Sequence, residues 1–373
     1  MKINHRQLSI MVFMSFIALK LLALPSLLYK ESGNASWIVA LVLMIIDAIY
    51  AYAIIELMKK SNSKNIYEFM KETLGVVLTK IFMFILVLKY AIVVLNITKG
   101  LEFFVVENLY NKFDWYLFIL PLVALVGFLV YKGLRNIGRV FEMFFWAIII
   151  GCIYIGVKAI SGVDVLTILP VFNKGVESLF SAGYKHLSWF GSSSFLIMIF
   201  GQVDFKNEKK SKLILYMIFG ILLVQFLYFV FFGLFGLTSP IHNFALSDIS
   251  QYYSGIFSTD ELSWMVVSLW IVAQAVQIAM YGYCLVKAIM FTFNIKNKIL
   301  PIVAIDALII LVGFISEKTI NLEAIFFSHF ASIITIIAQY IIPIFMWLGY
   351  LVKNKKNKSG GVNKNEKEIK NNI

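Results

Sequence analysis

Apolar runs long enough to cross a lipid bilayer recur from one end of the 373-residue chain to the other. In hydrocarbon, only helices and closed barrels satisfy every backbone polar group, and a helix needs about 20 apolar residues to span it. Runs of this length are typical of helices and not of the short alternating strands of a barrel. The composition agrees, with 60% hydrophobic and 14% charged residues. The sequence therefore predicts an all-α polytopic membrane protein.

We predict ten spans, in two sets of five. The first set is Leu8–Leu28, Trp37–Leu57, Ile81–Val105, Trp115–Tyr131 and Val140–Ile160. The second set is Leu187–Val203, Leu213–Leu237, Leu262–Phe293, Ile299–Ile315 and Ala324–Val352. Residues 1–352 then form one transmembrane domain, with one repeat at about 8–160 and another at about 187–352. The lysine- and asparagine-rich stretch 353–373 is predicted to be a disordered basic tail.

The basic residues predict the orientation of these spans. Most of the 33 lysines and arginines fall in alternate loops, including 59–64, 132–139, 206–212 and the tail. The positive-inside rule places these loops, and with them both termini, in the cytoplasm. The net charge of +12 is therefore a topology signal, and we expect no nucleic-acid partner.

The predicted connections include structure of their own. Between the second and third spans, Asn65 and Glu68 have the spacing of a helix-capping box, and Gly75 is placed to end the helix. The apolar stripe of this short amphipathic helix consists of Ile66, Phe69, Met70 and Leu74. Such a helix is expected to lie on the inner membrane surface. On the outer side, segments 161–186 and 238–261 mix apolar and polar residues and are expected to fold back as lids.

The first span contains a lysine, Lys20, near its middle, and Pro25 follows shortly after. An ammonium group in hydrocarbon is costly without a partner, and proline removes a backbone donor and disfavours helical geometry at Leu24. A charged and interrupted first helix suggests a cavity at membrane depth. The alternative is a tilted anchor helix whose lysine reaches the interface.

The sixth span is predicted to be interrupted as well. Five spans per half give the halves opposite topology, as in inverted-repeat transporters, where the first helix of each half is discontinuous at the binding site. The segment Gly191–Ser194 is rich in hydroxyls and poor in helix formers. The alternative is close helix packing through small residues.

Further polar residues lie in stripes inside the spans. Lys89 and Asn96 share a face of the third span, and Gln274 and Gln277 lie within a narrow arc of the eighth. In lipid these stripes must face protein or water, so they either contact a ligand or form interhelical hydrogen bonds. For a similar stripe with Gln339 on the tenth span, we favour hydrogen bonding.

Charged groups inside the spans are candidates for ion or proton coupling. They are Lys20, Asp47, Lys89 and Asp306. Either acid could pair with either lysine or carry a proton, and the sequence leaves these pairings open.

Motifs for soluble chemistry are missing from the sequence. It contains no Walker loop, no H-E-x-x-H and no G-x-G-x-x-G that enters a helix. Cys152 and Cys284 lie in apolar segments, so we expect neither a disulfide nor a metal site. We expect no enzymatic activity and no cofactor.

Three motifs carry a resemblance to a known family. They are ALKLLALPSLLYKESGNASWI, which runs from the first span to the start of the second, KGLRNIGRVFEMF between the fourth and fifth, and ILPVFNKGV after the fifth. Together, over about His5–Val352, they resemble the B subunit of bacterial spore germinant receptors, a spore germination permease family in the amino acid–polyamine–organocation superfamily. The resemblance implies a five-plus-five inverted fold with discontinuous helices 1 and 6, and a location in the spore inner membrane. It also implies a small-molecule germinant such as an amino acid, and partner A and C subunits.

The resemblance also implies a ligand pocket between spans one, three, six and eight. On this chain the pocket corresponds to Ala18, Leu19, Lys20, Leu21, Asn96, Gly191, Ser192, Ser193, Ser194 and Gln274, and the stripe on span eight adds Gln277. This chain departs from the superfamily pattern because IALKLLALP has no glycine at the first break. We hypothesise that Lys20 supplies the positive charge for a ligand carboxylate directly.

Three functions fit these observations. The first is a germinant-sensing subunit, in which a trapped small molecule shifts a two-state bundle and the change passes to partner subunits. The alternative is a proton-coupled amino acid transporter. A third is a passive scaffold or ion-conducting subunit with a vestigial pocket.

Overall fold

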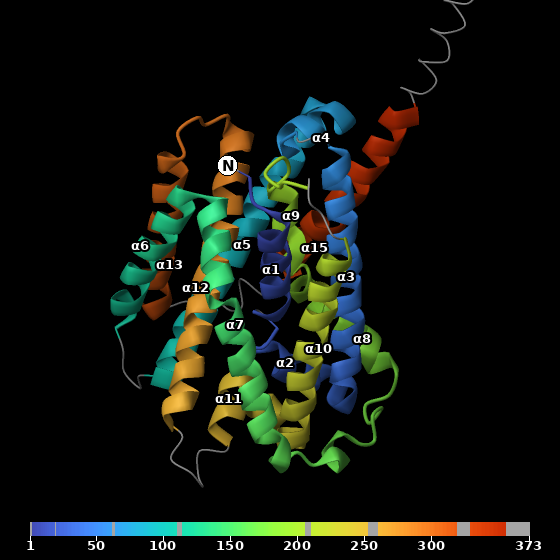
Figure 1. The fold of residues 1–373 in the computed structure, drawn as a ribbon, viewed down its shortest axis with the longest axis vertical. Helices are drawn as coiled ribbons and strands as arrows, with labels where there is room; N and C mark the ends of the chain where they lie inside the picture. Colours follow the sequence, from blue (N-terminus) through green and yellow to red (C-terminus); the bar gives the residue numbers. More distant parts are fainter. Residues whose placement is uncertain are drawn as a thin grey trace, which may run out of the picture.

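The computed structural model describes residues 2–18, 20–61, 64–109, 114–205, 210–252, 260–318 and 329–355. These residues form a bundle of helices that run mostly along its long axis (Figure 1). Within the described ranges, the β-structure is an isolated bridge between Ile3 and Val203. The all-α prediction is therefore confirmed.

The helices of the first half are α1 (His5–Ile17), α2 (Leu24–Ser32), α3 (Ser36–Lys60), α4 (Ile66–Leu74), α5 (Val76–Leu109), α6 (Trp115–Lys132) and α7 (Leu134–Ala159). Those of the second half are α8 (Glu177–His186), α9 (Phe195–Met198), α10 (Lys210–Phe235), α11 (Ala245–Tyr252), α12 (Asp260–Phe293), α13 (Ile299–Lys318) and α15 (His329–Ile336). Short 3-10 turns are η1 (Gly33–Ala35), η2 (Ile160–Gly162), η3 (Val165–Ile168), η4 (Leu187–Phe190), η5 (Ser192–Ser194) and η6 (Gly236–Ile241), and η7 (Ile337–Ile341) is a π-helical turn.

Among the described residues, six helical stretches are long and apolar enough to cross a membrane. They are Leu24–Lys60, Val76–Glu107, Leu134–Gly162, Ser211–Ile241, Val267–Phe293 and Ala331–Lys355, and Tyr116–Lys132 and Ile299–Phe314 are shorter apolar helices. The first stretch combines α2, η1 and α3, and the chain turns at Gly33, whose φ is +60°. A Cβ at Gly33 would also lie 2.3 Å from Asn173 Oδ1, so this turn requires glycine.

The outer surface of the bundle is apolar. Large hydrophobic side chains are exposed along its outer helices, among them Ile49 on α3, Phe128 on α6, Met143 and Ile150 on α7, and Leu222 on α10. A water-soluble protein rarely exposes apolar area on this scale, whereas hydrocarbon solvates it. Together with the long apolar helices, this surface identifies a polytopic membrane protein.

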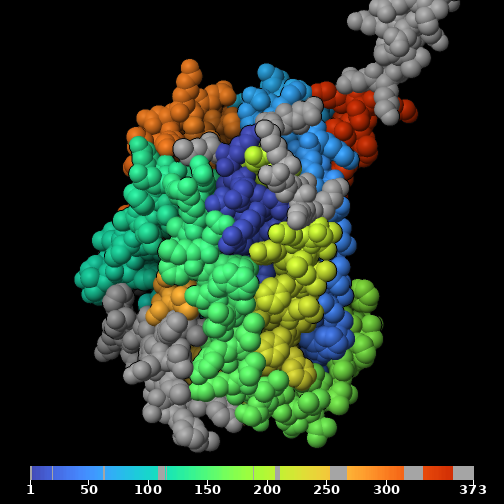
Figure 2. Space-filling model, in the orientation of Figure 1, coloured from blue at the N-terminus to red at the C-terminus, as the bar shows by residue number. Residues whose placement is uncertain are grey.

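Helix α1 lies inside the bundle. Every residue of α1 except Arg6 is buried, and α1 packs against α7 and α10. Figure 2 shows α1 flanked by these two helices on one face of the molecule. A helix that is apolar on all sides is expected to be enclosed by protein or lipid, and here it is enclosed by protein.

Both predicted interruptions are present. The first predicted span is two helices, α1 and α2, separated by a turn segment between Ile17 and Leu24, and Pro25 lies in the first turn of α2. The sixth predicted span is η4, the non-helical Gly191, η5 and the short helix α9. The breaks at these positions are therefore confirmed.

The predicted amphipathic helix is also confirmed as α4. The Asn65 side chain accepts a hydrogen bond from the Glu68 amide at 2.9 Å, and Gly75 follows the last helical residue. Ile66, Phe69 and Met70 are its buried face. In Figure 1, α4 and the N-terminus lie at one end of the molecule and α11 lies at the other.

The described residues of the two predicted lids, 161–186 and 238–252, include short helices. Helix α8 lies in the first of them and packs against α2 and α3, and α11 lies in the second. The last described helix reaches Lys355, so the predicted tail from 353 begins as helix and its remainder, 356–373, lies outside the described residues.

Candidate functional site

The two interruptions meet at a buried ion pair. Lys20, in the break between α1 and α2, places Nζ 3.4 Å from Oδ2 of Asp47 on α3. Both side chains are excluded from solvent, with 0% and 1% exposed. Lys20 Nζ also donates to Ser192 Oγ at 2.8 Å, and Ser192 Oγ donates to Asp47 Oδ2 at 3.1 Å. The Ser193 hydroxyl donates to the other carboxylate oxygen, Oδ1. Residues from both breaks therefore share one charged cluster.

Aromatic rings complete the surroundings of the ammonium group. Lys20 Nζ lies 5.4 Å from the ring centroid of Phe16 and 5.4 Å from that of Phe190. Each ring face attracts a cation, most strongly where water is excluded. The rings come from the residues just before each break, so each half of the chain contributes one of them.

Side chains of neighbouring helices satisfy the backbone carbonyl groups that the first break leaves free. Gln274 Nε2 on α12 donates to the carbonyl of Ala18 at 2.6 Å. Tyr228 on α10 donates its hydroxyl to the carbonyl of Lys20 at 2.7 Å. A broken helix is tolerated at membrane depth where the protein supplies such donors.

Side chains of neighbouring helices also donate hydrogen bonds to the carbonyl groups of the second break. The Tyr281 hydroxyl on α12 donates to the carbonyl of Ser192. The Tyr90 hydroxyl on α5 donates to the carbonyl of Ser194 at 2.9 Å. Side chains of helices α5, α10 and α12 thus donate hydrogen bonds to the carbonyl groups of both breaks and stabilise their non-helical geometry.

The side chain of Gln339 approaches Gly191 closely. A Cβ at this position would lie 1.5 Å from Cδ of Gln339, which is fully buried in the π-helical turn η7. The amide group of Gln339 therefore lies directly against the second break. The sequence favours an interhelical hydrogen-bonding role for Gln339, and its position makes it a candidate member of the site.

Helix α11 closes the first break from the side. The amide of Leu246 donates to the carbonyl of Leu21 at 3.3 Å, and the amide of Ala245 donates to that of Leu22 at 3.4 Å. Both amides belong to the first turn of α11, where a helix has no internal acceptors for its amide groups. The carbonyl groups of the break accept these hydrogen bonds, so each segment satisfies the backbone of the other. The described part of segment 238–261 thus folds back onto the first break through α11, and residues 253–259 lie outside the described residues.

The acidic residue of α11 is set to respond to pH. Burial raises the pKa of Asp248 from 3.8 to about 6, the Phe244 amide opposes this rise, and the Glu107 carboxylate adds to it. His242 Nδ1 lies 3.5 Å from Asp248 Oδ2, and burial lowers the pKa of His242. A carboxyl whose pKa is raised in the folded state stabilises that state when protonated.

We therefore expect the docking of α11 to be firmest below about pH 4 and to weaken as the pH rises through about 6. Hydrogen exchange of the α11 amides, corrected for intrinsic rates, would measure this change. Asp248→Asn should keep α11 docked over the whole range, because the amide cannot ionise. His242→Gln should leave the pH dependence in place, and its disappearance in that variant would contradict the assignment to Asp248.

Other predicted site residues lie near the cluster. Lys89 on α5 is 1% exposed, interacts electrostatically with Asp47, and has no hydrogen-bond partner for Nζ within the described ranges. Gln277 is fully buried about one turn from Gln274 on α12. Leu21 and Ser194 are also buried.

Asn96 and Asp306 take no part in the contacts of the Lys20–Asp47 cluster that the structure describes, and Leu19 cannot be compared. Asn96 is half-buried on α5, and the structure gives its Oδ1 no partner among the described residues. Asp306 lies on α13 against α6, where a Cβ at Gly127 would be 2.6 Å from its Oδ2. It is Asp47, rather than Asp306, that pairs with Lys20. Leu19 lies outside the described residues.

Sequence reasoning missed four contributors to the site, namely Phe16, Phe190, Tyr90 and Tyr228. Aromatic residues are frequent in this chain, with 34 Phe and 18 Tyr, so nothing in the local pattern separates these from lipid-facing ones. Their role follows from which carbonyl or cation each reaches across the bundle. Only long-range packing supplies that information.

Comparison with known proteins identifies the family of the chain. A family model described as "Spore germination protein" matches residues 2–322. The chain is also 23% identical over 227 residues to "Spore germination protein KB" of Bacillus subtilis (strain 168). That alignment covers 60% of this chain and 60% of the relative, so the chain spans about three fifths of the length of the relative it matches. Since the family model matches most of its length, the chain belongs to the spore germination protein family.

Proposed function

We propose that this chain is the membrane-embedded germinant-sensing subunit of a spore germination receptor, and that it binds a small molecule, an amino acid, between its interrupted helices. The observation that carries the proposal is the convergence of both breaks on the buried Lys20–Asp47 pair. An interrupted helix at membrane depth is costly unless it serves a site. Family membership supports a receptor or permease role over an enzymatic one.

The cluster suggests how a ligand would act. An amino acid carries one carboxylate and one ammonium group, the same two charges that Asp47 and Lys20 present to each other. A ligand carboxylate would compete with Asp47 for Lys20 and Ser192, and a ligand ammonium would compete with Lys20 for Asp47. A ligand that binds better to the rearranged cluster shifts the bundle toward that state.

The proposal includes an architecture and a location. The two sets of five spans form an inverted repeat, with discontinuous helices 1 and 6 facing each other. Both termini lie in the cytoplasm, as the positive-inside rule predicts. The protein lies in the spore inner membrane, and the conformational change passes to A and C subunits of the receptor.

A proton-coupled amino acid transporter is the second candidate. The same breaks would bind the substrate, and the intramembrane charges Lys20, Asp47 and Lys89 would carry the proton. The observation that favours it is that Lys89 has no hydrogen-bond partner within the described ranges although it is buried. Intramembrane ionisable groups of this kind mark proton pathways in many transporters.

The two functions predict different results for the purified protein. For the sensor, one of the standard amino acids should raise the thermal stability, by about 2.7 kcal/mol at a concentration 100 times its Kd. The same amino acid, isotopically labelled, should not accumulate in proteoliposomes that contain this chain alone. Accumulation driven by a proton gradient would instead establish the transporter, and an absence of both binding and flux would contradict both candidates.

A further inference from the structure

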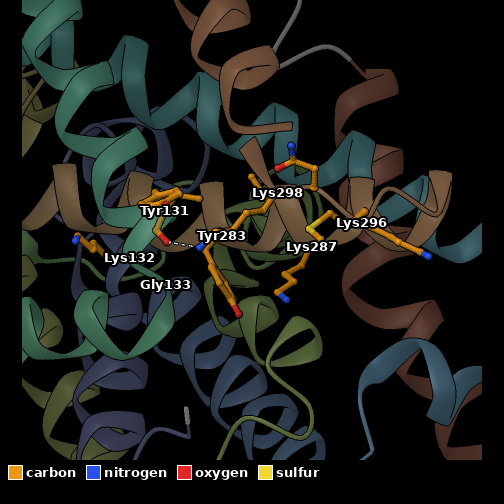
Figure 3. A pocket seen from close by; sticks show the side chains of 11 residues that line it. Tyr131, Lys132, Gly133, Tyr283, Lys287, Lys296 and Lys298 are labelled. Atoms are coloured by element: carbon orange, nitrogen blue, oxygen red, sulfur yellow. Dashed lines mark hydrogen bonds between the residues drawn. The ribbon is translucent and has the colours of Figure 1, made fainter. Parts of the chain in front are cut away.

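A basic cavity lies away from the helix breaks. It has a volume of about 410 Å³ and lies between the last turn of α6, the last turns of α12 and the connection from α12 to α13. Its polar lining includes Tyr131, Tyr283, Lys287 and Lys298 (Figure 3). Lys132 and Lys296 also line it, and neither Asp nor Glu is among its lining residues. The site proposed above shares no residue with this cavity.

Lys287 and Lys298 are two positive charges close together, and no carboxylate lies between them in the lining of the cavity. Lys298 Nζ donates to the backbone carbonyl of Tyr131 at 2.8 Å and lies 4.2 Å from the centroid of its ring, so its position is fixed. Lys287 is half-buried on α12 and is close enough to Lys298 for the two charges to repel each other. The structure gives Lys287 a ring contact with Tyr283 and, in the described part of the chain, no carboxylate partner. An anion between these lysines would relieve the repulsion.

The beginning of α13 adds to the positive potential. Lys298 directly precedes Ile299, the first residue of this 20-residue helix, and the first turn contains no acidic residue. A helix N-terminus carries a partial positive charge that favours anions. The cavity therefore combines lysine ammonium groups, a helix dipole and a lining without acidic residues.

Apolar side chains continue from the cavity toward the membrane. Phe128 on α6 and Leu300 and Val303 on α13 are exposed and lie within about one turn of cavity residues. The α12–α13 connection lies at the same end of the molecule as the N-terminus (Figure 1), which is the end predicted to face the cytoplasm. Basic pockets between transmembrane helices at this level suit anionic headgroups.

We propose that this cavity binds a phosphate group through Lys287 and Lys298. The phosphate is carried by an anionic phospholipid or is free in solution. For the lipid, the exposed apolar side chains of α6 and α13 receive the acyl chains. For a free phosphate, the lysine pair and the helix N-terminus are sufficient.

Two measurements on the full chain test this site and its source of phosphate. The first is retention of phosphatidylglycerol, against phosphatidylcholine, by protein taken from mixed vesicles, measured by native mass spectrometry. The second is the shift in thermal stability with inorganic phosphate, against chloride at equal ionic strength. Lys287→Gln should weaken binding about fivefold, and adding Lys298→Gln should weaken it about fivefold more. Retention without a phosphate shift identifies the lipid, and a phosphate shift without retention identifies the free anion.

The matched control is the double variant Lys71→Gln and Lys212→Gln. It removes the same charge from two exposed lysines, on α4 and α10, that do not line the cavity. It should leave retention and thermal shift within about twofold of the unmodified protein. Lys287→Gln leaves the Lys298–Tyr131 contact intact, so it separates loss of binding from loss of folding. Equal weakening in both double variants, or no weakening in either, would overturn the proposal.

Discussion

Replacing Lys20 with methionine should lower the free energy of unfolding by about 3 kcal/mol and abolish the response to germinant. Methionine fits a space of similar length, but it leaves Asp47 with a buried charge and, among the described residues, only the hydroxyl groups of Ser192 and Ser193 as donors. Removing one partner of a buried ion pair is costly because the other charge remains desolvated. Denaturant unfolding of the purified protein in detergent measures the first effect, and germination of spores that carry the variant measures the second.

A double-mutant cycle separates the two effects. Asp47→Asn should destabilise the protein by a similar amount, because Lys20 is then left without a carboxylate. Lys20→Met combined with Asp47→Asn should recover most of the stability, since no charge remains buried, and the coupling energy reports the contact directly. The double variant should still fail to respond. A normal response to germinant in either the single Lys20 variant or the double variant would contradict the proposed role of Lys20 in sensing.

Replacing Gly191 with alanine should cost about 1–3 kcal/mol of stability. The added Cβ would overlap the amide group of the Gln339 side chain, which is fully buried, so this group or the backbone of the break must move. Either the second break or η7 must then shift, and both lie beside the ion pair. Thermal unfolding would measure the loss, and a weakened response to germinant should accompany it.

Two further variants test whether the overlap with Gln339 causes this loss of stability. Gly183→Ala, on α8, adds the same methyl group where no atom lies within 4 Å, and it should be neutral or slightly stabilising. Gln339→Ala in the Gly191→Ala background should recover stability, because it removes the overlapping atoms. If that second change brings no recovery, the close approach between Gly191 and Gln339 is not the cause of the loss.

The local features of the site could be predicted because their signals are local. Lys20 within an apolar run and Pro25 after it mark an interrupted helix regardless of what surrounds it. Gly191 and the serines after it mark the second break in the same way. The capping side chain of Asn65 defines the start of α4 through one short contact within the same segment. Each inference uses residues within about one or two helical turns.

The pairing of charges could not be predicted in this way. Asp47 and Asp306 both lie inside apolar helices, and Lys20 and Lys89 are both candidates for a partner. The choice of Asp47 for Lys20 depends on α3 passing beside both breaks, which is a property of the assembled bundle. The hydrogen bonds from the Tyr90 and Tyr228 hydroxyl groups also depend on the assembled bundle, because their acceptor carbonyl groups are far away in the chain.

The sequence by itself determined that this is a helical membrane protein, where its first and sixth spans break, and which family it resembles. Hydrophobic length, helix-breaking residues and loop charge act over short distances, so they can be interpreted without a partner. Only the tertiary structure decided that α1 is enclosed by α7 and α10, that Lys20 pairs with Asp47, and that α11 closes the first break. Lipid and protein interior are almost equally apolar, so the sequence of a membrane helix does not specify which of its faces meets another helix.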